Sequence, residues 1–112
     1  MTRPKKGRTI SCSPAAYYFK PRGIPMSELE EVVLETDEFE AVRLADLLGM
    51  KQEEAALSMN ISRATFGRIV SKARKKLAES IINGKAIRIS EEMSEELKGR
   101  FKPRCSEKEE PR

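Results

Sequence analysis

One stretch of the chain, SRATFGRIVSKARKK at residues 62–76, combines basic, hydroxyl and small apolar side chains at close spacing. An arginine can donate two hydrogen bonds to a guanine edge, and an alanine or threonine methyl can contact the methyl group of thymine. Side chains of these types occur together at the start of the stretch, at Ser62, Arg63, Ala64, Thr65 and Arg68. We interpret these five residues as candidates for contacts with the base edges of double-stranded DNA.

Lysines follow further along the same stretch, where contacts with phosphate oxygens are favoured over contacts with bases. They are Lys72, Lys75 and Lys76. A second basic group lies near the N-terminus and comprises Arg3, Lys5, Lys6 and Arg8. We expect this group to follow phosphates or to enter an adjacent minor groove, as the N-terminal arms of homeodomains do.

Charge is strongly segregated along the 112 residues, although the net charge is only +4. Residues 1–27 carry +6, residues 28–54 carry −8, residues 55–89 carry +7 and residues 90–112 carry −1. A basic block on a defined element indicates a polyanion as partner. The acidic block is predicted to be a solvated face, or alternatively a surface for a protein partner. The acidic residues in the first part of this block, up to residue 40, are Glu28, Glu30, Glu31, Glu35, Asp37, Glu38 and Glu40.

The composition argues against an enzyme or a cofactor-binding protein. Histidine is absent, so a Cys–His nucleophile is excluded, and Cys12 and Cys105 do not form a zinc-binding pattern. We expect these cysteines to be free thiols in a reducing compartment. No apolar run approaches the ~18 residues of a membrane span, and no apolar signal core follows the basic N-terminus. The predicted location is cytoplasmic and nucleoid-associated, with no membrane contact.

Two helices with a tight break must position the basic stretch. A short helix is predicted from Lys51 or Gln52 to Ser58, and a longer one from after Ser62 to the Asn83–Gly84 pair. Asn60 suits a left-handed turn between them. Apolar residues recur at the spacing of the inner side of a helix-turn-helix, at Ala55, Met59, Ile61, Phe66 and Ile69. The helix after Ser62 is therefore predicted to be a recognition helix for the major groove.

The flanking segments predict short strands around a helical core. Strands are expected at residues 17–19, 31–35 and 85–90, and a helix with Asp37 as N-cap and Glu40 in a capping box should end at Gly49. The aromatic residues Tyr17, Tyr18 and Phe19 are predicted to be core or dimer contacts rather than base-stacking groups. A last helix would bury Ile89, Met93, Leu97 and Phe101. The predicted fold class is mainly α, a helix-turn-helix of winged-helix-like size with short flanking β-strands.

Three regions are predicted along the chain. Residues 1–14 form a flexible basic arm, residues 15–89 the helix-turn-helix domain, and residues 90–112 a C-terminal helix with a charged disordered tail. Two short strands, at 31–35 and 85–90, are too few for a stable sheet within one chain. We therefore predict a homodimer, joined through these strands or through the C-terminal helix.

A long stretch of the chain, from FKPRGIP to KAIRI, resembles the domain-of-unknown-function 134 family, also called uncharacterised protein family 251. The segments DEFEA, RLAD, QEEAA and SRATFGR are the specific part of this resemblance, which covers roughly residues 3–89. It implies a small prokaryotic protein with a helix-turn-helix similar to region 4 of bacterial sigma factors. Gln52–Ser71 would then form the DNA-reading unit, with the recognition helix at Ser62–Lys76.

The N-terminal segment departs from the family pattern. Family members commonly carry a C-R-R-V-C segment, whereas Gly7 and Ser11 stand where its cysteines often do and only Cys12 remains. This departure removes the basis for carrying a metal or redox role over to this segment.

The expected function is sequence-specific binding of double-stranded DNA by a transcriptional regulator. One alternative is an adaptor that binds RNA polymerase or another protein through the acidic segment 28–54. A second alternative is an RNA-binding protein, which would depend less on the entry of a helix into a B-form groove.

Overall fold

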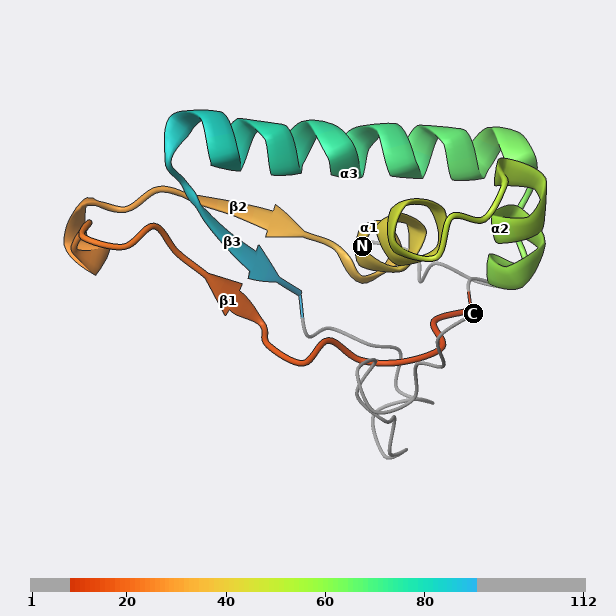
Figure 1. Cartoon of the computed structure of the whole chain (residues 1–112), viewed down its shortest axis with the longest axis horizontal. Helices are drawn as coiled ribbons and strands as arrows, with labels where there is room; N and C mark the ends of the chain where they lie inside the picture. The colour runs from red at the N-terminus through yellow and green to blue at the C-terminus, as the bar shows by residue number, and fades with distance from the viewer. Residues whose placement is uncertain (1–8, 91–112) are drawn as a thin grey trace, which may run out of the picture.

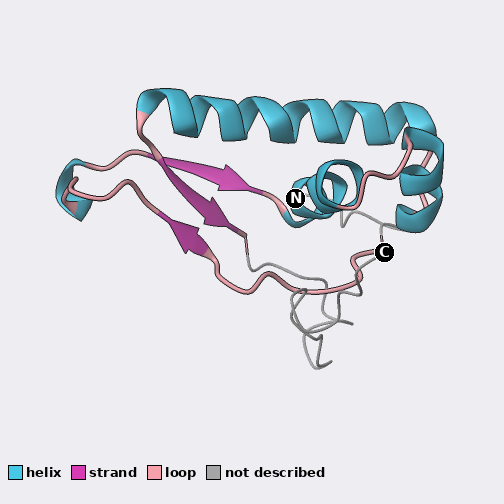
Figure 2. Ribbon diagram, in the orientation of Figure 1, coloured by secondary structure: helices cyan, strands magenta, loops and turns pink. Residues whose placement is uncertain are grey.

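The computed structural model describes residues 9–90. The elements in chain order are β1 (Tyr18–Phe19), the 3₁₀ turn η1 (Met26–Glu28), β2 (Glu31–Leu34), α1 (Thr36–Val42), the π-helical turn η2 (Arg43–Leu47), α2 (Gln52–Met59), α3 (Arg63–Asn83) and β3 (Ala86–Ile89). Figures 1 and 2 show α3 along the whole length of the molecule, with the sheet beneath its C-terminal half and α1 and α2 near its N-terminal end. The prediction of a mainly α fold with short strands is confirmed.

Helix α3 forms the long upper layer of the molecule in Figure 1. Its N-terminal half packs on α1, η2 and α2 around a core that includes Leu44, Met59 and Phe66. Its C-terminal half covers one face of the sheet, where Ala73 packs with Leu34 and Ile89 in a second core cluster. The same helix therefore fixes the helical end of the molecule relative to the sheet.

The three strands form one sheet in the order β1-β3-β2. Strand β3 lies in the centre, antiparallel to β1 and parallel to β2, with Val32 opposite Ile87 and Leu34 opposite Ile89. Ala86 of β3 is fully buried. The premise that these strands lack partners within one chain was wrong, because β3 pairs with both neighbours. Strand pairing therefore gives no reason to expect a homodimer.

The sheet face opposite α3 carries a polar group of three residues from three strands. The Tyr18 hydroxyl donates to Glu31 Oε2 at 2.8 Å, and Arg88 Nε donates to Glu31 Oε1 at 3.2 Å. The hydrogen bond from Tyr18, with a smaller contribution from Arg88, lowers the pKa of the Glu31 carboxyl, and the same bond raises the pKa of Tyr18. The predicted strand at 17–19 is confirmed, with Tyr17 packed on the second core cluster and Phe19 exposed.

Replacing Tyr18 with phenylalanine is expected to raise the pKa of the Glu31 carboxyl towards its ordinary value, because the largest cause of its lowering is removed. A carboxyl with a lowered pKa in the folded state stabilises the fold above its ordinary pKa, and this contribution is lost as the pH falls through the lowered value. An NMR titration of Glu31 measures the shift. Tyr17→Phe is the matched control; an unchanged Glu31 titration in Tyr18→Phe would contradict the assigned cause.

Helix α1 begins two residues earlier than the sequence suggested. Its N-cap is Glu35, whose backbone N–H donates to Glu38 Oε1 at 2.9 Å, so the predicted cap at Asp37 with Glu40 was wrong. Asp37, Glu38 and Glu40 of this helix are all buried. The prediction of a solvated acidic face is thus wrong for these residues.

Glu40 is fully buried beside Arg43, which follows it by one helical turn. Arg43 donates from Nε to Glu40 Oε1 at 3.1 Å and from its terminal nitrogen to Glu40 Oε2 at 3.0 Å. A guanidinium and a carboxylate in this two-bond geometry are each largely satisfied by the other. The ion pair allows two charges to lie inside the helical layer.

The described part of the predicted basic arm, residues 9–14, contacts the helices. Thr9 N donates to Met59 O at 3.0 Å, and Ser11 N donates to the Glu40 carboxylate at 3.4 Å. Cys12 is buried and disulfide-bonded, so the expectation of a free thiol was wrong at this position. Cys105 lies outside the described residues.

The predicted C-terminal helix and tail, residues 91–112, also lie outside the described residues. Ile89, expected in that helix, belongs to β3 instead. Within residues 9–90, no helix has both the length and the apolar character needed to cross a bilayer.

Candidate nucleic-acid interface

A connection of three residues joins α2 to α3. Asn60 adopts the left-handed conformation with φ of 60°, and the Ile61 N–H donates to Ala56 O at 3.0 Å. Asparagine enters this region at lower cost than most residues that carry a side chain. Ser62 Oγ then accepts from Thr65 N at 3.1 Å and caps α3. The predicted break, the turn residue and the cap are all confirmed.

The inner sides of α2 and α3 are apolar and closely packed. Ala55, Met59 and Phe66 have no exposed surface, Ile69 is buried at the edge, and Ile61 packs against the same cluster. Full burial of a side chain such as methionine or phenylalanine stabilises the fold by roughly 1.5–3 kcal/mol. The predicted apolar spacing is therefore the packing surface that holds the two helices at a fixed angle.

The opposite side of α3 is solvent-exposed, and we call it the outward face. It comprises Arg63, Ala64, Arg68, Lys72 and Lys75. None of its four basic side chains forms an ion pair with a carboxylate of residues 9–90. The outward face thus presents cations that no carboxylate of these residues neutralises through an ion pair.

A chain of hydrogen bonds orders the first turns of the outward face. The Ser62 hydroxyl donates to Thr65 Oγ1 at 2.9 Å, and an Arg68 terminal nitrogen donates to the same oxygen at 3.4 Å. Thr65 is half-buried, whereas Ser62 and Arg68 are exposed. The structure therefore brings together the predicted base-edge residues and restricts the direction of the Arg68 guanidinium.

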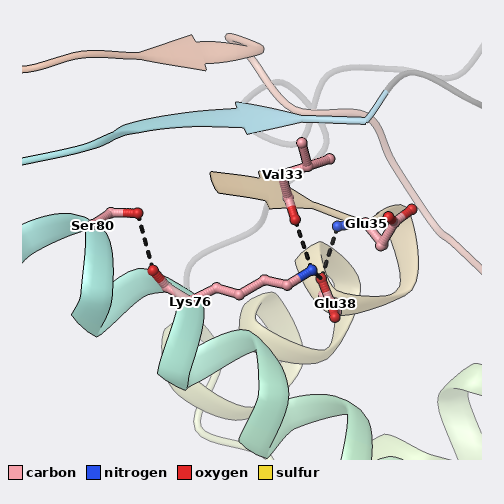
Figure 3. Close-up of polar contacts among 5 residues, drawn as sticks. All are labelled: Val33, Glu35, Glu38, Lys76 and Ser80. Carbon is pink, nitrogen blue, oxygen red and sulfur yellow. Dashed lines mark hydrogen bonds and ion pairs between the residues drawn. The ribbon is translucent and has the colours of Figure 1, made fainter. Parts of the chain in front are cut away.

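Lys76, predicted to contact phosphate, is used inside the fold instead. Its Nζ lies 2.7 Å from Glu38 Oε1 and 2.7 Å from Val33 O, as Figure 3 shows. In the same figure Ser80 Oγ donates to Lys76 O one turn further along α3. Glu38 is almost fully buried, so releasing Lys76 would leave a buried carboxylate without this partner. We remove Lys76 from the candidate interface.

Arg74 is likewise committed to the fold. Its Nε and terminal nitrogen lie 3.1 Å and 2.9 Å from the two oxygens of Asp46 in η2, and this hydrogen bonding raises the pKa of the guanidinium. The pair is half exposed and contributes little to stability on its own. It links α3 to η2 and leaves the Arg74 guanidinium occupied within the fold.

Sequence reasoning did not find the contact between Gln52 and Gly67. A Cβ atom built on Gly67 would lie 3.7 Å from Gln52 Oε1, so the Gln52 amide lies over this glycine. The signal was present, since Gln52 shares the inner face of α2 with Ala55, Ala56 and Met59 at helical spacing. The other predicted phosphate contacts, at Arg3, Lys5, Lys6 and Arg8, lie outside the described residues.

Comparison with known proteins assigns the family. A family model described as "Protein of unknown function DUF134" matches residues 1–96. The chain belongs to this family. The resemblance of the QEEAA and SRATFGR segments therefore reflects membership in DUF134.

Relatives of this DUF134 chain carry the name UPF0251 protein. One from Desulfosudis oleivorans is 58% identical over 80% of the chain and 64% of the relative. One from Caldanaerobacter subterraneus subsp. tengcongensis is 54% identical over 80% of the chain and 75% of the relative. One from Vibrio vulnificus is 49% identical over 88% of the chain and 98% of the relative. No solved structure matches the chain.

Proposed function

We propose that this DUF134 protein binds double-stranded DNA in a sequence-specific manner and acts as a transcriptional regulator. In this proposal α2, the turn at Asn60 and α3 form a helix-turn-helix similar to sigma factor region 4. The observation that supports it most is the outward face of α3. Arg63, Arg68, Lys72 and Lys75 are exposed there without ion pairs among the described residues, whereas Arg74 and Lys76 on the same helix are paired.

The arrangement suggests distinct roles along α3. A B-form major groove is wide enough to admit a helix, and helix-turn-helix proteins read base edges with the first turns of the second helix. Arg63 and Arg68 lie in those turns, so we assign them to base contacts together with Ser62, Ala64 and Thr65. Lys72 and Lys75 lie one to three turns further on and are assigned to phosphates. The free N–H groups at the start of α3 favour an anion there as well.

The alternative of an adaptor that binds a protein through the acidic segment is less well supported. Asp37, Glu38 and Glu40 are buried, and Glu31 is bonded to Tyr18 and Arg88. Three acidic side chains of that segment are therefore buried and a fourth is bonded within the sheet, whereas Glu28, Glu53 and Glu54 remain exposed. Pairing in a homodimer stays part of the proposal only because a single small module binds DNA weakly.

Selection from a pool of random DNA duplexes, with the full chain immobilised, tests the proposed function. We expect enrichment of one short motif, and we expect the enriched duplex to bind more tightly than a mixed-sequence duplex or an RNA duplex of equal length. Equal affinity for all three probes would reject sequence-specific DNA binding. Tighter binding to RNA would favour the RNA-binding alternative instead.

Replacing Lys75 with alanine is expected to weaken binding to all duplexes by a similar factor, because a phosphate contact is independent of sequence. The plot of log affinity against log salt concentration should become shallower by about 1, as expected for the loss of one phosphate contact. Fluorescence anisotropy at several salt concentrations measures both quantities. A loss confined to the selected motif would assign Lys75 to a base instead.

A further inference from the structure

Gly67 occupies an unfavourable place for a glycine. It lies in the second turn of α3, a helix of 21 residues, and its backbone has ordinary helical φ, since the described glycines with positive φ are Gly23, Gly49 and Gly84. A glycine inside a helix destabilises it relative to alanine because the unfolded chain has more freedom to lose. Because glycine lowers the stability of the helix, its presence would be explained by an interaction that requires the absence of a side chain at position 67.

The packing of the described residues does not supply that reason. Close approach of a neighbouring helix would require a glycine, but the one atom within 4 Å of an added Cβ is Gln52 Oε1, at 3.7 Å. This is an ordinary van der Waals distance, and the atom is at the end of a flexible side chain. Alanine at position 67 would therefore fit the folded protein without strain.

The position of Gly67 points to an external group. Gly67 lies one turn after Arg63 and next to Arg68, where the outward face of α3 meets the start of α2. A helix lying in a groove has base edges opposite the centre of its face and the sugar–phosphate strands along its flanks. Gly67 is on such a flank, and the neutral amide of Gln52 beside it can donate a hydrogen bond to a phosphate oxygen.

We propose that Gly67, with the amide of Gln52, is the contact point for the sugar–phosphate backbone of one DNA strand. The missing side chain lets the strand touch the helix backbone and so sets how deeply α3 enters the groove. This inference rests on the proposed DNA binding and adds a positioning residue to it. It assigns a role to a residue that carries no charge and no hydrogen-bonding side chain.

Side chains of increasing size at position 67 test the contact point. Gly67→Ala and Gly67→Leu are made in the full chain, and their affinity for a fluorescein-labelled mixed-sequence duplex at low salt is compared with that of the unmodified chain. We expect at least about tenfold weaker binding for Ala, equivalent to ~1.4 kcal/mol, and a larger loss for Leu. Thermal unfolding should show an increase in Tm of roughly 4 °C for Gly67→Ala, because the helix gains an alanine.

Ala78→Leu is the matched control, since Ala78 is exposed on the same helix about three turns beyond Gly67. It should bind the duplex as the unmodified chain does. Equal binding by the unmodified chain and both Gly67 variants would overturn the contact point and leave DNA binding intact. A lower Tm for Gly67→Ala would also overturn the contact point, because it would show that the fold itself requires glycine at position 67. No binding by the unmodified chain would reject the proposed function itself.

Discussion

Replacing Arg43 with methionine is expected to destabilise the fold by about 3–5 kcal/mol, the cost of removing one partner from a buried ion pair. Glu40 has no exposed surface, and both of its carboxylate oxygens receive hydrogen bonds from Arg43. Methionine fills a similar volume but donates no hydrogen bond. The loss is a large fraction of the ~5–15 kcal/mol total stability of a typical domain. Urea unfolding followed by circular dichroism measures it.

Two control variants separate loss of the charge pair from loss of packing. The double variant Glu40→Met with Arg43→Met should be more stable than Arg43→Met alone, because no buried charge is left without its partner. Arg88→Met breaks an exposed pair with Glu31 and should change stability little. If Arg43→Met and Arg88→Met had equal effects, the buried pair would not have the role assigned to it.

Loss of both Arg63 and Arg68 is expected to abolish recognition of the selected duplex. Each well-formed arginine–guanine pair contributes about 1–3 kcal/mol of discrimination, so removal of each should reduce the preference for its base pair by roughly 5- to 150-fold. The single variants Arg63→Ala and Arg68→Ala should each relax the preference at a different base pair. Anisotropy titrations with the selected duplex and its single-site variants measure the effect.

Arg22→Ala is the matched control for these two variants. Arg22 is an exposed arginine without an ion pair among the described residues, and it lies in the connection between β1 and β2. That connection is at the end of the molecule opposite α2 in Figure 1. Binding should be nearly unchanged in Arg22→Ala. Full affinity in the double variant Arg63→Ala with Arg68→Ala would show that another face of the protein contacts DNA.

The elements around the candidate interface were predictable because local signals agree there. Asn60 in a left-handed turn, Ser62 as a cap and Gly84 at the end of α3 each have a conformational preference that does not depend on distant residues. The spacing of the apolar residues from Ala55 to Ile69 also indicated which sides of the two helices face each other. Helices α2 and α3 consequently begin and end within one residue of their predicted bounds.

The errors arose where distant residues decide the outcome. From its residue type alone, a glutamate is expected to be solvent-exposed. Glu38 is buried because Lys76, 38 positions away in the sequence, donates a hydrogen bond to it in the folded chain. The same contact removed a lysine from the predicted interface. The strand partners of β3 were equally non-local, since Tyr18 and Arg88 are far apart in sequence. The packing around Gly67 had to be known before a role for this residue could be inferred.

The central position of β3 has a consequence for folding during synthesis. β1 and β2 come early in the chain, but the strand that lies between them is made only after all of α3. Until Ala86–Ile89 leave the ribosome, a two-residue strand and a four-residue strand have no common neighbour, and such fragments are unstable in water. The helical half can assemble first through local contacts, and the nascent domain becomes complete only when its last strand inserts between the first two.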